Sequence, residues 1–286
     1  IKTLDADTFT QEQMERLMDV QLVNANAAVR GYAGDWDTFT VRRGKNGYFY
    51  RKPDGRFMLL HWDSDLAFQS TGHEFLRNNG GVPNYFGKTY NRRWFNYYLT
   101  ELLDNLTENS ARIEGWFQAE EDASTDYDMN ASFYRSWFSG RKANTVTQLL
   151  NTDIVNFSMI TGNGSSVSTP DTTIELDGVG PSKLYGVRVA GHPEGVFTWN
   201  SYTAWTISGV YLHSGANSLS IEGFDREGQV LESLVFTVNK TGDAPPVPGL
   251  DAAPGSWNLA VDEVFDLDAS SSYDPEGGVL GFTWSV

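Results

Sequence analysis

The stretch GKNGYFYRKPDGRFMLLHWDSDLAF, residues 44–68, contains two β-prone runs joined by the turn KPDG at 52–55. Proline fixes φ in such a turn and glycine accepts a positive φ, so the sequence predicts a β-hairpin. The second run is strongly apolar and ends at two acids one residue apart, Asp63 and Asp65. A strand that delivers two carboxylates to one point favours a functional site at its end.

The composition is that of a folded protein and excludes several classes of function. The 286 residues suggest two or three domains, and the hydrophobic fraction of 40% and aromatic fraction of 14% are far from those of a disordered chain. A formal net charge of -16 argues against nucleic acid as a partner, because nucleic-acid binders present a basic face. The absence of cysteine removes thiolate metal sites, and no apolar run is long enough to span a membrane.

Around the hairpin, the spacing of apolar residues is helical. It predicts one long amphipathic helix over 10–30 that ends before Gly31, and further helices over 90–106, 111–122 and 132–150. A helix, a hairpin and then more helices make the first part of the chain an α+β unit.

The remainder of the chain has the pattern of β-structure. The Gly/Ser/Thr-rich run 161–173 is typical of a linker, and six alternating runs follow it, which predicts a β-sandwich. A Pro-rich spacer at 240–255 precedes a further β module too short to be a complete sandwich. We therefore expect domains at 1–160, 161–242 and 243–286, the last one truncated.

Oxygen-bearing side chains gather around the hairpin: Asp35, Asp37, Asn46, Asp63 and Asp65. Mg²⁺ favours a few carboxylates together with substrate phosphates, so this set suits phosphoryl transfer, in which one acid orients the attacking hydroxyl and the others hold metal. By spacing alone the same residues also fit helix caps, turn positions and strand ends, and hydrolysis by paired carboxylates stays open as well.

Three motifs resemble a known family, the spore-coat-protein-H-like (CotH) atypical protein kinases. They are D-W-D at 35–37, N-G-Y-F-Y-R-K-P-D-G-R-F at 46–57 and H-W-D-S-D-L-A-F at 61–68. The resemblance covers roughly residues 1–150, where it implies a kinase-like C-terminal lobe.

The resemblance also implies roles for individual residues. Asp37 would be the catalytic-loop aspartate that activates the hydroxyl, Asn46 and Asp63 would hold metal with Asp65 as a further metal ligand, and Asp35 would assist them. The cofactors would be Mg²⁺ and ATP, and the substrate a protein Ser or Thr. A kinase also needs a lobe that holds the ATP phosphates, which we expect to precede Ile1 in a parent protein.

The β modules resemble bacterial Ig-like modules at 161–242 and polycystic-kidney-disease-type (PKD) or cadherin-like repeats at 243–286. In the last module Asp266, Asp268 and Asp274 are candidate Ca²⁺ ligands, with a plain β-turn as the alternative.

Aromatic residues of the middle module suit either a carbohydrate surface or a sandwich core, namely Trp199, Tyr202 and Trp205.

Two functions of different classes fit these observations. The first is a fragment of a secreted or cell-surface CotH-type kinase that phosphorylates protein Ser or Thr. The second is a non-catalytic extracellular structural or adhesive protein, in which the same modules form a scaffold that contacts neighbouring surface or matrix proteins. Tandem β modules indicate an extracellular or cell-surface location in both cases.

Overall fold

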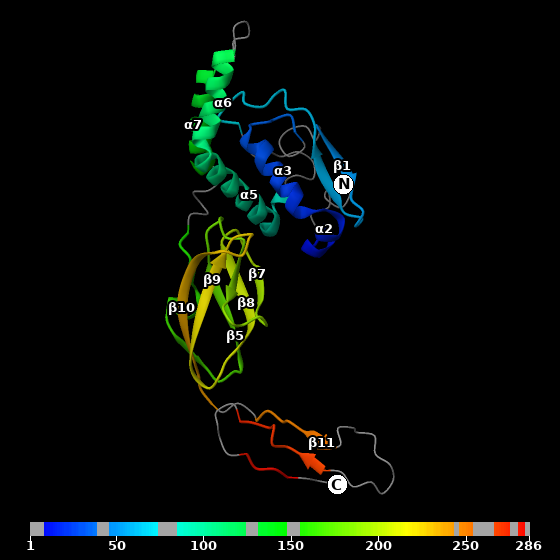
Figure 1. Ribbon diagram of the computed structural model, residues 1–286, viewed down its shortest axis with the longest axis vertical. Helices are drawn as coiled ribbons and strands as arrows, with labels where there is room; N and C mark the ends of the chain where they lie inside the picture. The colour runs from blue at the N-terminus through cyan, green and yellow to red at the C-terminus, as the bar shows by residue number, and fades with distance from the viewer. Residues whose placement is uncertain are drawn as a thin grey trace.

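The protein is described by a computed structural model that covers residues 9–38, 46–73, 85–123, 131–147, 155–242, 246–253, 266–274 and 280–283. Figure 1 shows a group of helices with a small hairpin, then a β-sandwich, then a short C-terminal pair of strands. We call residues 9–147 the helical unit and residues 155–242 the sandwich. The chain is thus mixed α and β with several sheets, as the sequence predicts.

The first helical segment is divided into α2 (Gln11–Leu17) and α3 (Val20–Tyr32). Met18 is extended and bridges to Phe57, and the backbone N–H of Asp19 donates to the Phe57 carbonyl at 2.7 Å. Asp19 then caps α3, because its Oδ1 accepts from the N–H of Leu22 at 3.3 Å. The prediction of one continuous helix ending before Gly31 is therefore wrong, since a cap and a strand contact interrupt it.

The hairpin at the centre of the sequence prediction is confirmed. Strand β1 (Gly47–Arg51) pairs antiparallel with β2 (Phe57–His61), and the backbone N–H of Lys52 donates to the Arg56 carbonyl across the turn. Leu59 of β2 is buried in the core, and Phe49, its partner on β1, packs against the same core. The hairpin lies against α3 (Figure 1). Its open end, where β1 begins and β2 ends, is therefore beside the C-terminal end of that helix.

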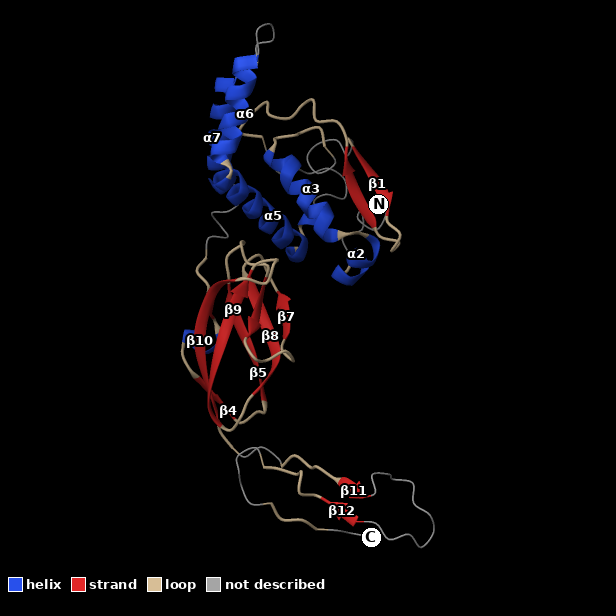
Figure 2. Ribbon diagram, in the orientation of Figure 1, coloured by secondary structure: helices blue, strands red, loops and turns tan. Residues whose placement is uncertain are grey.

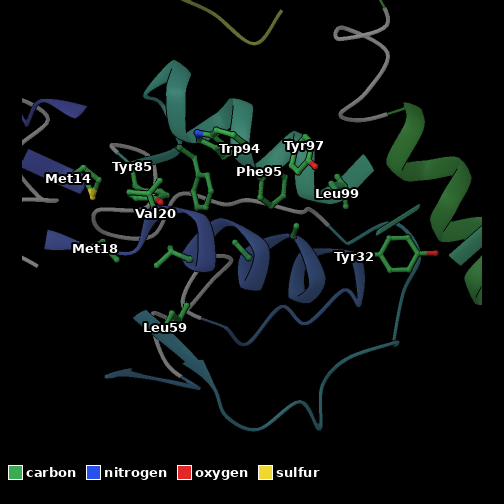
Figure 3. Packing of buried hydrophobic residues seen from close by; sticks show 14 of the residues in the cluster. Met14, Met18, Val20, Tyr32, Leu59, Tyr85, Trp94, Phe95, Tyr97 and Leu99 are labelled. Carbon is green, nitrogen blue, oxygen red and sulfur yellow. The ribbon is translucent and has the colours of Figure 1, made fainter. Parts of the chain in front are cut away.

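In the described part of this unit, three further helices follow: α5 (Thr89–Glu108), α6 (Ser110–Ala123) and α7 (Ala131–Thr145). The predicted helices at 90–106 and 111–122 are confirmed, and the one predicted at 132–150 ends its α-helical part at Thr145. Helix α5 packs along α3 (Figure 2). Their shared core, together with Leu59 of the hairpin, is drawn in Figure 3, which labels Met14, Met18, Val20, Tyr32, Leu59, Tyr85, Trp94, Phe95, Tyr97 and Leu99.

The sandwich consists of two four-stranded sheets around one core. One sheet has the order β4-β10-β9-β6, from Val167–Thr169, Val230–Lys240, Gly215–Phe224 and Gly186–Val189. The other has the order β3-β5-β8-β7, from Ser158–Met159, Thr173–Val179, Ala204–Tyr211 and Val196–Trp199. The six predicted strand runs all form strands, whereas the Ig-like relationship stays a prediction.

The predicted linker at 161–173 is not a linker. A 3-10 turn, η2 (Thr161–Gly164), leads into β4, which pairs parallel with β10, so the Gly/Ser/Thr-rich run begins the sandwich. Further along, β11 (Asp251–Ala253) pairs antiparallel with β12 (Asp266–Asp268) in a two-stranded sheet. The PKD-like relationship of this last part stays a prediction.

Candidate functional site

A buried arginine at the end of α3 draws the predicted site residues together. Arg30 is 3% exposed, and its Nε donates to Oδ2 of Asp35 at 2.8 Å, while Nη2 donates to the same oxygen. Nη1 donates to the carbonyl of Asn46 and Nη2 to the carbonyl of Asp63 at 2.9 Å. One guanidinium therefore contacts the residue before β1, a residue shortly after β2 and the D-W-D segment. We call these residues, with Asp37, the Arg30 cluster.

The chain reaches this position because α3 ends abruptly after Tyr32. Gly34 adopts φ +65°, a region that favours glycine, and the N–H of Asp35 donates back to the Arg30 carbonyl at 3.1 Å. This turn brings the Asp35 carboxylate back to the Arg30 side chain, with which it forms an ion pair. The pair is almost fully buried, since Asp35 is 1% exposed. Breaking such a pair on one side leaves an uncompensated charge in the interior.

A second buried arginine, Arg141 of α7, fixes the same helix end. It donates to the carbonyls of Gly31 and Tyr32 and, from Nη1, to those of Thr71 and His73. Burial lowers the pKa of Arg141 to about 10, so the guanidinium remains cationic at neutral pH. The carbonyls at the C-terminal end of α3 therefore have a cationic donor, which stabilises that end.

Asp37 and Asn46 are in direct contact. Asp37 is buried, and the amide Nδ2 of Asn46 donates to its Oδ2 at 3.4 Å. Asn46 adopts φ +58°, in the left-handed region that asparagine tolerates better than most residues. This conformation directs the Asn46 carbonyl to Arg30 while the side chain reaches Asp37.

Asp63 is exposed, and its backbone is bent at φ +53°. Its carbonyl is held by Arg30, and its Oδ1 accepts from the N–H of Asp65 at 3.4 Å. Asp65 is also exposed, and in the described part of the chain its contact with the cluster is this backbone N–H alone. The structure thus brings Asp35, Asp37, Asn46 and Asp63 together and leaves the Asp65 side chain outside.

The sequence analysis missed Arg30 itself and two residues beside the cluster, Ser64 and His61. Ser64 Oγ donates to Oδ2 of Asp35 at 3.0 Å and lies 3.0 Å from Nε2 of His61. In sequence, Arg30 looks like an ordinary basic residue in the last turn of a helix, where it is favourable anyway. The spacing of Arg30 and Asp35 was the one available signal, and it is not specific.

The outer face of the hairpin is aromatic and exposed. Tyr48 and Trp62 are each 57% exposed and meet edge to face with ring centres 5.5 Å apart. Tyr50 and Leu60 share this face by strand alternation and are also exposed. The face leads directly to Asp63, so a flat apolar group bound there would lie next to the cluster.

An open cleft of about 600 Å³ lies between α3 and β2. Its walls are largely apolar, with Leu22 and Val29 from the helix and Met58 from the strand, and Arg30 and Ser64 contribute polar groups.

The donor set can be compared with what a metal requires. In the described residues, no three His, Cys, Asp or Glu side chains gather as a metal cage. Mg²⁺ bound with substrate phosphates needs only one or two carboxylates, and Asp37, Asn46 and Asp63 offer oxygen ligands of that kind. Oδ1 of Asp35 is buried and has no hydrogen-bond partner in the described part of the chain. These residues therefore fit a magnesium held jointly with phosphates.

The other predicted sites have less support. Asp268 accepts from the N–H of Ser270 at 2.7 Å, which lowers its pKa and marks it as a turn residue. The side chain of Asp266 lies outside the described residues, so a Ca²⁺ site with Asp268 and Asp274 stays a prediction. Trp199 and Trp205 are buried in the sandwich core, and so they cannot form an exposed carbohydrate surface.

Comparison with known proteins agrees with the resemblance to the CotH kinases. A family model described as CotH kinase protein matches residues 1–120 of the chain. This segment includes the whole Arg30 cluster and the hairpin. The resemblance to CotH kinases is therefore confirmed for residues 1–120 and untested beyond them. No curated protein and no solved structure matches the chain. None of the helices in the described residues has the length and apolar character that a membrane crossing requires.

Proposed function

We propose that the Arg30 cluster is a phosphoryl-transfer site that uses Mg²⁺ and ATP to phosphorylate a hydroxyl of a protein Ser or Thr. The observation that carries the proposal is the meeting of Asp37, Asn46 and Asp63 at one place, within the segment that matches the CotH kinase family. These residues come from three separate stretches of sequence.

The environment of each residue suits a different role. Asp37 is buried beside the Asn46 amide, which orients its carboxylate to accept a hydrogen bond from the attacking hydroxyl and then its proton. Asp63 is exposed, with its carboxylate available to a metal, and Asn46 provides a second oxygen ligand. Magnesium, when bound, would neutralise charge on the phosphates during transfer.

In the transfer itself, the substrate oxygen forms a bond to the γ-phosphorus while the bond from that phosphorus to the β-γ bridging oxygen breaks. ADP leaves with the electron pair of the broken bond, and the hydroxyl proton passes to Asp37. The contribution of Arg30 is to position the residues, because it holds the backbone at both Asn46 and Asp63.

The exposed aromatic face supports a nucleotide as the phosphate donor. Tyr48 and Trp62 offer flat surface beside Asp63, and a purine base stacked there would place its phosphates near the carboxylates. A protein substrate and an extracellular or cell-surface location belong to the same proposal, and they rest on the family match and on the β modules that follow.

The test is phosphate incorporation from labelled ATP by the protein with whatever residues flank this chain in its natural form. Wild type should label protein with Mg²⁺ and not with EDTA. Asp37→Asn and Asp63→Asn should each lower the rate by at least about 100-fold, a typical contribution for a general base or a charge-stabilising group. Asp122→Asn on the exposed surface of α6 is the matched control and should keep the wild-type rate.

Equal, background-level labelling by wild type and both site variants would refute the proposal. The non-catalytic scaffold would then be the remaining interpretation of the same modules.

A further inference from the structure

A third buried arginine lies where the helical unit meets the sandwich. Arg93 of α5 is 1% exposed. Its Nη1 donates to the carbonyl of Tyr202 at 2.6 Å, and its Nη2 donates to those of Pro181 and Leu184 at 2.8 and 2.6 Å. The guanidinium carbon also lies 3.6 Å from the ring centre of Trp199. One side chain of the helical unit thus binds two loops and a core tryptophan of the sandwich.

Tyr185 makes the reciprocal contact, from the sandwich to the helices. Its ring packs against Trp94 and Tyr97 of α5, with ring centres 4.9 and 5.7 Å away. The Tyr185 backbone is fixed on its own side, since its carbonyl accepts from Nε1 of Trp199 at 3.2 Å. Trp94 and Tyr97 are both buried, so the aromatic face of α5 is closed by a residue of the sandwich.

The contact extends to the helix that carries the candidate site. Nε2 of Gln21, in the first turn of α3, donates to the hydroxyl of Tyr185 at 3.4 Å, and the hydroxyl of Tyr98 donates to Oε1 of the same Gln21. A continuous set of contacts therefore runs from the sandwich loops through α5 to α3, whose last turn holds Arg30.

We propose that the sandwich end formed by residues 180–185 and 199–203 is a permanent docking partner of α5, so that the helical unit and the sandwich behave as one cooperative body. The sandwich is then a positioning element for α5 and α3 and not a freely attached module. The three carbonyls that Arg93 holds would lose this donor if the two parts separated, and the aromatic face of α5 would become exposed. This inference does not depend on the proposed phosphoryl transfer.

The experiment is hydrogen exchange and thermal unfolding of the full chain, in wild type, Arg93→Ala and Arg188→Ala. Arg188 is the matched control, because it is an exposed arginine of β6 paired with Glu222 within the sandwich. In wild type, amides of α5 and of the sandwich strands should open together with equal stability. Arg93→Ala should lower Tm by roughly 5–10 °C and speed exchange in α5, α3 and residues 180–185. Arg188→Ala should lower Tm by no more than about 2 °C.

Tyr185→Ala is the second variant, and it decides the matter if Arg93→Ala does not fold. It should speed exchange in α5 and in the first turn of α3, because the ring and the contact with Gln21 are both lost. The proposal is overturned if either variant exchanges like wild type in α5 and α3, or if α5 and the sandwich strands of wild type open with clearly different stabilities.

Discussion

Arg30 and Arg93 are both buried arginines on helices of the helical unit, and both donate to loop carbonyls, yet they organise different regions. Arg30 pairs with the Asp35 carboxylate and holds residues from its own part of the chain. Arg93 holds carbonyls 88 to 109 residues away and stacks on Trp199. The first region joins groups that can do chemistry, whereas the second joins two structural bodies.

The difference shows how one side-chain type serves two purposes. A guanidinium presents several donors in a fixed plane, so it can satisfy several backbone carbonyls at once. Where a carboxylate joins the arrangement, as at Arg30, acidic groups can be kept close together in the interior. Where an aromatic ring joins it, as at Arg93, the result is a rigid junction.

The largest effect on stability is expected from removing the buried ion pair between Arg30 and Asp35. Arg30→Ala removes the cation from a buried pair and should cost about 3–5 kcal/mol of unfolding free energy. The measurement is urea denaturation. Replacing both partners, as Arg30→Met with Asp35→Leu, should recover part of that loss, because no unpaired charge is left inside, although the Asn46 and Asp63 carbonyls still lose this donor. If the double variant is less stable than Arg30→Ala alone, the ion pair is not the reason for the loss.

Raising the pH above 10 should destabilise the helical unit, because it contains buried tyrosines. Burial raises the pKa of Tyr32 to about 12, with Arg141 opposing, and burial also raises that of Tyr98 to about 12. Their folded pKa values lie above the unfolded value of 10.0, so the stability they contribute is complete below pH 10 and is lost as pH rises to 12. Arg141, whose pKa burial lowers to about 10, loses its proton more readily in the folded protein over the same window, so it offsets part of the loss from the tyrosines.

Thermal unfolding from pH 8 to pH 12, with tyrosinate absorbance recorded in parallel, measures this loss. In Tyr32→Phe, the stability should fall less steeply between pH 10 and pH 12, because the contribution of Tyr32 to that fall is removed. If the docking inference is right, the sandwich should lose structure at the same pH as the helices. Persistence of a folded sandwich after the helices have melted would separate the two regions.

A smaller effect is expected at the start of α3. Asp19→Ala removes the N-cap and should cost about 1 kcal/mol, whereas Asp19→Asn keeps a capping oxygen and should cost less. Burial opposes ionisation of Asp19, yet its hydrogen bonds to Lys52 and Leu22 lower its pKa overall. Its contribution is therefore present above pH 3.8 and lost as pH falls below that value. Urea denaturation at pH 7 and pH 3 tests both points, and equal costs for the two variants at pH 7 would contradict the cap.

Sequence reasoning succeeded where local patterns decide structure. The hairpin at 47–61 is predictable because its sequence contains a recognisable turn between two β-prone runs. Helix α5 is predictable because its apolar residues have a helical spacing. It failed where a distant contact overrides a local pattern. Met18 continues a helical apolar pattern, but its pairing with Phe57 breaks the helix, and Val167–Thr169 looks like linker until it pairs with β10.

The candidate site was predicted in part for the same reason. The acidic residues are visible in sequence because carboxylates near strand ends are informative. Arg30 and Ser64 are ordinary residue types, and only the turn after Tyr32 and the bends at Asn46 and Asp63 bring them into the cluster. Burial of Trp199 and Trp205 likewise depends on how two sheets face each other, which strand alternation alone leaves open.

The central claim is that the Arg30 cluster holds a nucleotide through magnesium, and calorimetric titration of ATP into the naturally flanked protein tests it most directly. Wild type should bind ATP with Mg²⁺ and lose most of that affinity with EDTA. Asp63→Asn should weaken binding by at least about 10-fold, the effect of one lost charged contact of about 1.4 kcal/mol. Asp65→Asn should weaken it less, because that side chain stands outside the cluster. Equal ATP binding by wild type and Asp63→Asn, or no binding by wild type, would contradict the account.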